Sequence, residues 1–305
     1  MTTTPPLNTE PVRPLTPPGV LPLDLPPGLG PFTPSDAARR GVSRSALERM
    51  VRDGRVVRLV RGVYLDASRP CPPSVRAEAL AMAVGSERVA CGLTAAWVLG
   101  AGRPALAYAA GVPGGDPGGP LPLEMRGRRE RRLGPDEMVR VGSVLATAPV
   151  RTAIDLARRL DLDRAVAVTD ALLRARVMSH VSLLEAAQVA TGPGSVNVRQ
   201  VAARAEARSA GPAESVLRLR WHDARLPTPI PGFAFGGLRV ALALPSHRFA
   251  VAVAGLLTER HRGLLRTRGW RVVELRGSQV LTASARALSQ HLEREFHQHL
   301  LEEVG

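Results

Sequence analysis

The sequence predicts a protein of class α+β or α/β with three structured parts. Two short helices followed directly by a β-ribbon, near residue 60, outline a winged helix-turn-helix. A mixed, mainly helical middle region follows, with apolar residues at helical spacing. From residue 214 the order helix, hairpin, strand, helix, strand, helix indicates an α/β layer and not a helical bundle. The length of 305 residues suggests about two domains.

Residues 1–31 hold ten of the 27 prolines and show no helical or strand period. Proline fixes φ and removes a backbone donor, so we expect a disordered, polyproline-like arm. A proline-motif ligand is the alternative to an inert tail. The expected domain boundaries are then 32–70 for the winged helix, 71–195 for the middle region and 196–305 for the C-terminal domain.

Residues 32–70 contain the signals of a winged helix. Thr33 and Ser43 can cap two helices, and each helix ends before a glycine. Leu47, Met50 and Val51 are spaced to form the buried stripe of the second helix. Two valine-rich runs then flank an Arg-Gly pair, which predicts a hairpin. The expected elements are helices at 34–40 and 44–53 and strands at 56–60 and 63–65.

Residues 71–195 are expected to be mostly helical, with one strand and a basic loop. Leu80, Val84, Leu93 and Trp97 are the core candidates of the first helical stretch. The expected elements are a helical stretch at 74–100, a Gly/Pro-rich loop at 111–120, a strand at 121–125, and helices after 149, at 162–176 and after 182.

The C-terminal part follows a linker at about 191–196 and a further arginine-rich helix. A glycine pair predicts the turn of a hairpin, and a long apolar run predicts a buried strand. The expected elements are a helix at 215–224, a hairpin at 233–244, a strand at 249–255, a helix at 256–268, a strand at 271–275 and a helix at 284–303.

The chain is strongly basic, with 41 Lys+Arg against 27 Asp+Glu and a formal net charge of +14. Not one of these cations is a lysine. A GC-rich genome explains the bias, but its chemical consequences remain: arginine stays charged and its planar fork suits phosphate oxygens and guanine edges. Double-stranded DNA is therefore the expected partner. The missing lysine excludes a Walker site, a Schiff-base enzyme and a lysine-dependent nuclease.

Several other protein classes are excluded or not expected. Two cysteines, Cys71 and Cys91, cannot make a disulfide framework and lack the spacing of a zinc site. The longest charge-free apolar stretch has 14 residues, whereas a membrane span needs ~20. No signal peptide and no glycine-rich cofactor motif is present, so we expect a cytoplasmic protein without a cofactor.

The winged helix holds the candidate DNA-binding residues. Residues 35–69 contain nine Arg against four Asp+Glu. The second helix is expected to contact base edges, and Arg58 and Arg61 of the ribbon to contact phosphates. A solvated face of an arginine-rich domain is the alternative. The candidates are Arg44, Ser45, Arg49, Arg52, Arg55, Arg58 and Arg61.

Two further clusters have competing interpretations. A basic run near residue 130 could be a second phosphate contact or a solvated loop. His291, Glu295 and His299 follow each other at four-residue steps and could offer metal ligands, but no second element completes the site, so we expect no metal. The basic run consists of Arg126, Arg128, Arg129, Arg131 and Arg132.

Two stretches resemble a known family. Residues 32–64, above all the ribbon VRLVRGVY at 57–64, resemble the winged-helix domain of the AbiEi antitoxins of type IV toxin–antitoxin systems. Residues 147–157 resemble a segment that follows this domain in actinobacterial relatives. Residues 214–280 resemble the very-short-patch-repair-like endonuclease domain, of the PD-(D/E)XK class, that often closes such chains. This last resemblance implies a restriction-endonuclease-like C-terminal layer.

The chain departs from the nuclease pattern at the catalytic positions. Alanine stands at three positions where relatives have carboxylates, Ala241, Ala252 and Ala254, and only Glu214 remains of the acidic set. A metal-dependent nuclease needs clustered carboxylate oxygens to hold its metal. The resemblance therefore implies a retained fold that has lost its chemistry.

Three functional hypotheses follow. The first is a non-enzymatic DNA-binding regulator or antitoxin-like repressor with an inactive nuclease-like domain. The second is an active metal-dependent endonuclease whose carboxylates have moved to Glu214, Glu259 and Glu274. The third is an interaction module that neutralises a toxin protein, which a neighbouring nucleotidyltransferase-like toxin gene would favour.

Overall fold

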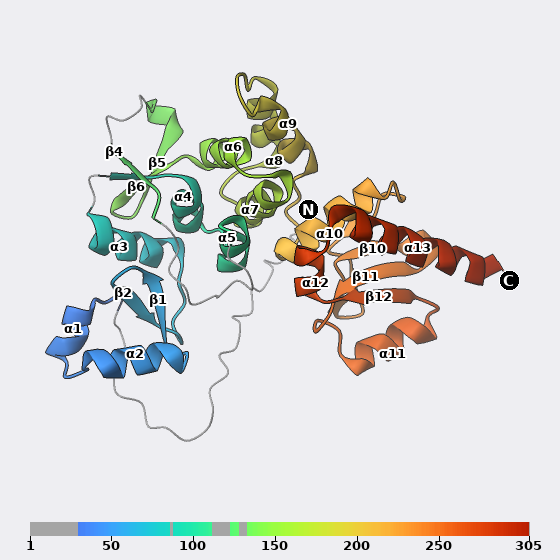
Figure 1. The fold of residues 1–305 in the computed structure, drawn as a ribbon, viewed down its shortest axis with the longest axis horizontal. Helices are drawn as coiled ribbons and strands as arrows, with labels where there is room; N and C mark the ends of the chain where they lie inside the picture. The colour runs from blue at the N-terminus through green and yellow to red at the C-terminus, as the bar shows by residue number, and fades with distance from the viewer. Residues whose placement is uncertain (1–29, 86–87, 112–122, 128–132, 305) are drawn as a thin grey trace, which may run out of the picture.

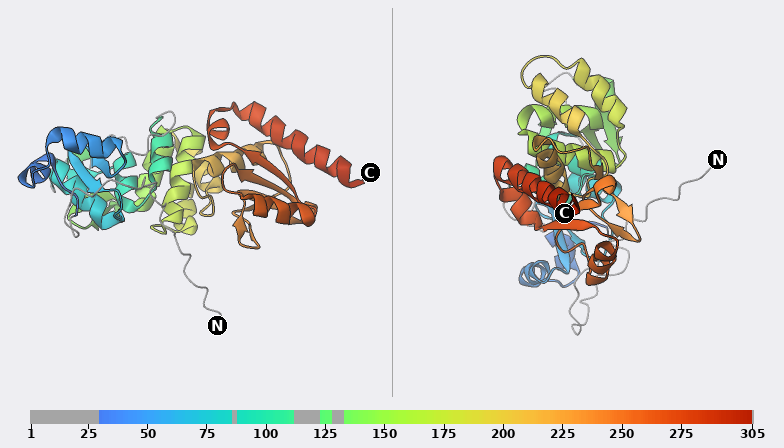
Figure 2. Two further views of the ribbon diagram at one scale, coloured as in Figure 1. Left: turned by 90° about the horizontal axis from the view of Figure 1, so that it is seen from below. Right: turned by 90° about the vertical axis from the view of Figure 1, so that its right-hand side faces the viewer.

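The computed structural model describes residues 30–85, 88–111, 123–127 and 133–304. The predicted arm, apart from its last two residues, and the glycine-rich loop at 112–120 lie outside these ranges. The mixed class is confirmed, because helices and small sheets occur in all three parts of the molecule. The molecule is elongated, with the N-terminal helices and ribbon at one end and the C-terminal layer at the other (Figures 1 and 2).

The N-terminal part has the predicted helix, helix and ribbon. Thr33 caps the first helix in a capping box with Asp36, and the Ser43 hydroxyl accepts a bond from the Ala46 amide. A pairing that the sequence did not predict adds a third segment to the ribbon: Phe32 and Tyr64 exchange two backbone hydrogen bonds of 2.9 Å. The elements are α1 (Pro34–Arg39), α2 (Arg44–Arg52), β1 (Val56–Val60) and β2 (Val63–Asp66).

The predicted helical stretch at 74–100 is wrong in its middle, because a strand interrupts it. This strand, β3 (Arg88–Ala90), pairs in parallel with β6 (Val144–Thr147) and antiparallel with β4 (Met125–Gly127). Partners this remote in sequence leave no local pattern, so helical propensity misled the prediction. The strand expected at 121–125 is likewise displaced to β4. The flanking helices are α3 (Pro73–Val84), α4 (Gly92–Leu99) and α5 (Arg103–Ala109).

The middle region is less helical than predicted, because it contains a four-stranded sheet of order β4-β3-β6-β5. β5 (Met138–Val141) follows a short 3-10 helix, η1 (Pro135–Glu137), and forms a hairpin with β6. Four helices come next and agree with the predicted ones within a few residues. They are α6 (Pro149–Arg159), α7 (Leu162–Arg174), α8 (His180–Gln188) and α9 (Ser195–Arg204).

The predicted domain boundaries at 70/71 and 195/196 do not separate hydrophobic cores. Val60 and Val63 of the ribbon pack in the same cluster as Leu80 and Trp97 of the middle region. The wing is therefore attached to the middle region by its core. α9 also contributes to this cluster and packs against α6, α7 and α8, so it belongs to the middle region.

The C-terminal layer has a sheet of order β12-β11-β10-β7, in which only β11 and β12 are parallel. The hairpin expected at 233–244 is shorter than predicted. It ends with β9, after which β10 pairs with β7 and β11 instead, and the short β7 was missed. The strands are β7 (Ile230–Pro231), β8 (Ala234–Phe235), β9 (Leu238–Arg239), β10 (Leu242–Leu244), β11 (Phe249–Val253) and β12 (Arg271–Leu275).

Helices cover both faces of this sheet. Trp221 of α10 and Phe296 of α13 pack with Phe249 on one face. Leu265 of α11 packs with Ala250 on the other face of the sheet. In Figure 1 this face is the lower one, where α11 lies below β11 and β12. A short helix, α12, was not predicted. The elements are α10 (Pro212–Asp223), η2 (Pro245–His247), α11 (Glu259–Thr267), α12 (Gly277–Thr282) and α13 (Ala285–Val304).

A buried carboxylate joins the middle region to the C-terminal layer. Asp170 of α7 is fully buried and accepts hydrogen bonds from the Ser215 hydroxyl at 2.7 Å, Arg218 at 2.8 Å and the Glu206 amide at 2.6 Å. Burial raises the pKa of Asp170, while its three donors act in the opposite direction. The apolar residues of α10 also belong to two different cores: Leu219 packs in the core of the middle region, and Trp221 packs in the core of the C-terminal layer.

We expect Asp170→Ala to destabilise the whole protein. The Arg218 side chain, only 13% exposed, would lose its carboxylate partner. Breaking such a pair costs about 3–5 kcal/mol, which corresponds to a fall in Tm of roughly 6–20 °C. Thermal unfolding followed by circular dichroism measures this fall. The control is Glu48→Ala, which removes an exposed partner of Arg44 and should change stability by less than ~0.5 kcal/mol. Equal shifts for both variants would contradict the prediction.

Candidate nucleic-acid interface

The outward face of α2 presents an exposed basic surface. Leu47 and Met50 are buried against α1 and the ribbon, which turns the polar side chains of α2 to solvent. Glu48 is the one acidic residue among them and pairs with Arg44 at 3.2 Å. The predicted contact residues of this helix are all exposed and share this outward surface: Arg44, Ser45, Arg49 and Arg52.

The predicted arginines of the wing differ in how far they are exposed to solvent. Arg61 is exposed at the tip, where Gly62 has a φ of +77° that favours glycine. Arg58 is half-buried, with its guanidinium 5.4 Å from the centre of the Tyr64 ring and a hydrogen bond of 3.2 Å to the Tyr64 hydroxyl. Arg55 is also half-buried. Arg61 is therefore the wing side chain that is free to meet a phosphate, whereas Arg58 has a packing role.

The second predicted basic patch is only partly described. Arg126 lies in β4 opposite Val89 of β3, and its side chain is half-buried. Four of the five predicted patch residues lie outside the described residues, so the patch stays a prediction: Arg128, Arg129, Arg131 and Arg132.

The three alanines at the positions that resemble the nuclease pattern lie near the ends of β10 and β11. Ala241 is buried in the cluster under α10 and α13, whereas Ala252 is buried in the cluster under α11. Ala254 is exposed in the turn that follows β11. Methyl groups at these positions offer no metal ligand, and two of them are part of the hydrophobic core.

Glu214, the remaining acidic residue of the nuclease pattern, is buried in an ion pair. Its two carboxylate oxygens accept hydrogen bonds from Arg239 at 2.6 and 2.7 Å, and one of them also accepts the Ala210 amide at 2.8 Å. The arginine joins α10 to β9. This geometry gives Glu214 a structural partner, and the same carboxylate would have to leave Arg239 to bind a metal.

The carboxylates of the alternative nuclease site are not brought together. Glu259 and Glu274 both contact Arg262, on the α11 side of the sheet, while Glu214 lies on α10. Hydrogen bonds from Arg262 lower the pKa of Glu274. Across residues 30–85, 88–111, 123–127 and 133–304, no group of three or more His, Cys, Asp or Glu side chains could hold a metal ion.

His299 and Glu295 of α13 are likewise engaged in structural contacts. His299 is buried, and its Nε2 lies 2.6 Å from the carbonyl oxygen of His247. Glu295 accepts a hydrogen bond from Arg271 at 3.1 Å. Two of the three residues whose spacing suggested metal ligands, Glu295 and His299, therefore hold α13 against its neighbours.

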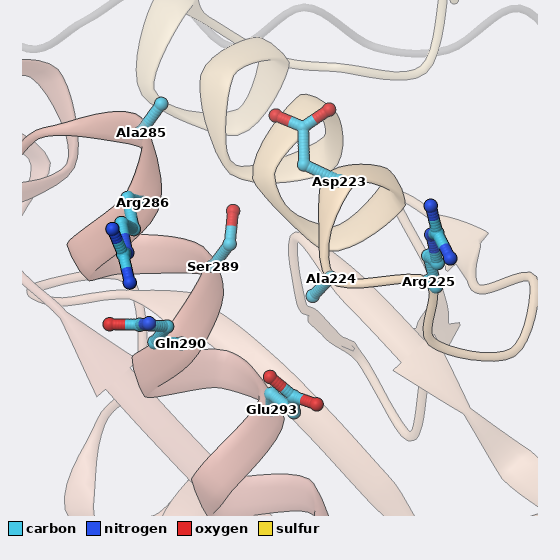
Figure 3. A pocket seen from close by; sticks show the side chains of 8 residues that line it. All are labelled: Asp223, Ala224, Arg225, Ala285, Arg286, Ser289, Gln290 and Glu293. Atoms are coloured by element: carbon cyan, nitrogen blue, oxygen red, sulfur yellow. The ribbon is translucent and has the colours of Figure 1, made fainter.

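A pocket of about 400 Å³ lies between the end of α10 and the start of α13 (Figure 3). Asp223 at the end of α10 and Arg225 just beyond it face Arg286 and Glu293 of α13 across the pocket. Its acidic and basic side chains balance, so the pocket lacks the single-sign charge that favours a nucleic-acid phosphate.

Sequence reasoning overlooked one basic surface, on α11. Arg260 and Arg266 are exposed on its outward face. The three-residue steps from Arg260 to Gly263 and from Gly263 to Arg266 were the available signal, because residues three apart are neighbours on a helix surface. None of the described helices is long and apolar enough to cross a membrane.

Comparisons with known proteins agree with the N-terminal prediction. The model of a family described as a transcriptional regulator, AbiEi antitoxin, matches residues 28–65. The resemblance to this family is thus confirmed for the winged-helix segment. Two uncharacterized proteins from two strains of Mycobacterium tuberculosis are each 29% identical over 272 residues, covering 83% of this chain and 98% of the relative. No solved structure matches significantly, and the nuclease-like character of the C-terminal layer stays a prediction.

The capping box of α1 should make the stability of the winged helix depend on pH. Hydrogen bonds from the Thr33 hydroxyl and amide lower the pKa of Asp36 below its usual 3.8. A lowered pKa contributes stability above the unfolded value, and this contribution is lost as pH falls through the folded value. Asp36→Ala should therefore lower Tm at neutral pH, and its difference from wild type should shrink as pH falls below 3.8.

Melting curves across pH test this, with Asp36→Asn as the matched control. Asparagine keeps an acceptor oxygen but does not titrate in this range. The gap in Tm between the Asn and Ala variants should thus stay constant with pH. A constant gap between wild type and Asp36→Ala would contradict the prediction.

Proposed function

We propose that this protein is a DNA-binding transcriptional regulator or antitoxin-like repressor that does not act as an enzyme. The observation that carries the proposal is the exposed arginine face of α2, which lies inside the segment that matches the regulator family. The two similar mycobacterial proteins are uncharacterized, so they suggest no function for this chain. The proposal therefore rests on the chemistry of this face and on the family match.

The winged helix is suited to sequence-dependent binding of double-stranded DNA. A recognition helix enters the major groove with its N-terminal residues toward the bases. Arg44 and Ser45 occupy that part of α2, and Arg49 follows in its last turn. Arginine can bind guanine O6 and N7 with two hydrogen bonds. Arg61, at the tip of the wing, is placed to contact a phosphate, which adds affinity but no sequence preference.

The two kinds of contact should respond differently to mutation. Arg44→Ala or Arg49→Ala should relax sequence preference, with a loss of ~1–3 kcal/mol at the preferred base. Arg61→Ala should weaken binding to all sequences and reduce the salt slope by about 1. Arg199→Ala, on the distant α9, is the control and should change neither property.

Selection of bound genomic fragments, followed by mobility-shift titrations across salt concentration, measures both effects. Arg58→Ala should instead lower Tm, because this side chain packs on Tyr64. The proposal would fail if the wild-type protein bound no genomic fragment at low salt.

We also propose that the C-terminal layer is a nuclease-like domain without catalytic activity. What supports this is the order helix, antiparallel strands, helix and parallel strand from α10 to β12, with alanines at the resembling catalytic positions and Glu214 paired to Arg239. Wild-type protein should neither cleave plasmid DNA with Mg²⁺ or Mn²⁺ nor change its Tm when these ions are added. Cleavage that EDTA abolishes, and that Glu214→Ala removes, would establish the endonuclease alternative.

A triple variant, Ala241→Asp, Ala252→Glu and Ala254→Asp, tests the alignment behind this proposal. Two of the new carboxylates would stand in the hydrophobic core, where an unpaired charge destabilises the domain without metal. Mg²⁺ or Mn²⁺ should then raise Tm, because a ligand that binds only the folded state stabilises it. If neither ion raises Tm, the alanines are ordinary core residues and the nuclease resemblance must be withdrawn.

The family description also names antitoxins, which makes a toxin protein a second candidate partner. A nucleotidyltransferase-like toxin encoded beside this gene would favour that role. Co-expression of the two proteins, with growth as the readout, would test it.

A further inference from the structure

The outward face of α11 is basic and has no part in the function proposed above. Arg260, Gly263 and Arg266 follow one another at three-residue steps, which places them on the same side of the helix. Leu265, on the opposite side, is buried against the sheet. The two arginines are both exposed, so their guanidinium groups flank a position that carries no side chain.

Of the arginines on α11, Arg260 and Arg266 are the two that are least engaged with carboxylates. Arg262 is engaged, because it donates hydrogen bonds to both Glu274 and Glu259. Arg266 makes a single exposed contact of 3.3 Å with Glu259, and such pairs are weak. Arg260 has no carboxylate partner among the described residues. Glu259, which is 77% exposed, lies on the same face four residues before Gly263. Two arginines against this one carboxylate leave the face with a net positive charge, which attracts an anion.

Neither packing nor backbone geometry explains the glycine in the middle of α11. A Cβ added at Gly263 would meet no heavy atom within 4 Å. Its φ lies outside the left-handed region, so alanine could occupy the position and would be the better helix former. Glycine does allow another molecule to approach the helix backbone closely.

The surface beside Gly263 is hollowed. A cavity of about 570 Å³ lies between α11 and the tip of the β8–β9 hairpin, lined by Gly236, Arg260, His261, Gly263, Leu264 and Thr267. The hairpin is held in place by its own aromatic side chains. Phe233 and Phe235 lie 5.7 and 6.2 Å from the Trp270 ring, centre to centre. The hollow thus belongs to packed structure rather than to a loose loop.

α11 and α2 lie toward the same edge of the molecule. In Figure 1 α2 lies below β1 and β2, and α11 lies below β11 and β12. The right-hand view of Figure 2 also shows both helices at the lower edge. Their outward basic faces therefore point to the same side.

We propose that the outward face of α11 binds the phosphate backbone of the same DNA duplex that α2 reads. Arg260 and Arg266 would contact phosphates, and Gly263 would let the strand approach the helix. These contacts carry no sequence information, so they add affinity and fix the direction of the duplex across the molecule. The inference rests on the proposed function, since it places a second contact on the same ligand.

The test compares long and short duplexes with the full-length protein. The probes are a mixed-sequence duplex of about four helical turns (~40 bp) and one of about one turn (~10 bp). Arg260→Ala/Arg266→Ala should lower affinity for the long duplex roughly tenfold and reduce its salt slope by about 2, with little effect on the short one. Arg286→Ala/Arg294→Ala, which removes the same charge from exposed positions on α13, is the matched control.

Gly263→Ala provides a second variant that does not threaten the fold. It should raise Tm, because alanine favours the helix, and yet weaken binding to the long duplex. A glycine without a binding role would raise Tm and leave binding unchanged, which would overturn the inference.

The outcomes separate this inference from the proposed function. If Arg44→Ala and Arg49→Ala weaken binding but the α11 variants match the α13 control, the α11 contact is wrong and the α2 contact stands. If only the α11 variants weaken binding, α11 binds DNA and the role of α2 is wrong. If wild-type protein binds neither duplex at low salt, both proposals fail.

Discussion

The arrangement of the two halves of the molecule depends on the hydrogen bonds around Asp170. This carboxylate is fully buried, so each oxygen needs partners from inside the protein. It finds them on α10 and at the start of the segment that leads to α10. Two flanking contacts follow the same helices: Arg174 donates to the Ser209 carbonyl, and Arg220 pairs with Asp163. These directed bonds hold the two parts in one relative orientation, whereas a flexible linker would let two domains reorient.

The same packing connects the wing to the C-terminal layer through the middle region. Arg103 of α5 donates to the Arg58 carbonyl at 3.4 Å, while Tyr108 of the same helix packs against the C-terminal core. Burial raises the pKa of Tyr108 to about 12, so its hydroxyl stays neutral at physiological pH. α5 thus contacts the two parts of the molecule that carry α2 and α11. A ligand that touches both would meet a surface set before binding.

Local signals explain which elements the sequence could predict. Thr33, Ser43 and the glycines that end helices gave α1 and α2 almost to the residue, and an apolar run gave β11. β3 escaped prediction because its partners β4 and β6 are far away in sequence. Side-chain roles were harder to predict. Nothing in the local sequence distinguishes Arg58, which packs on Tyr64, from Arg61, which is exposed, and the pairing of Glu214 with Arg239 depends on the fold of the layer.

The division of α10 between two cores has an evolutionary consequence. Leu219 completes the middle core and Trp221 the C-terminal one, so a single helix serves two parts of the protein. A lineage that lost the C-terminal layer would also lose the cover of Leu219 and the partners of Asp170. Selection for a stably folded protein would then preserve the layer, whatever chemistry it has. Residues of the layer that do not contact α10 could drift, whereas those that hold α10 in place could not change freely.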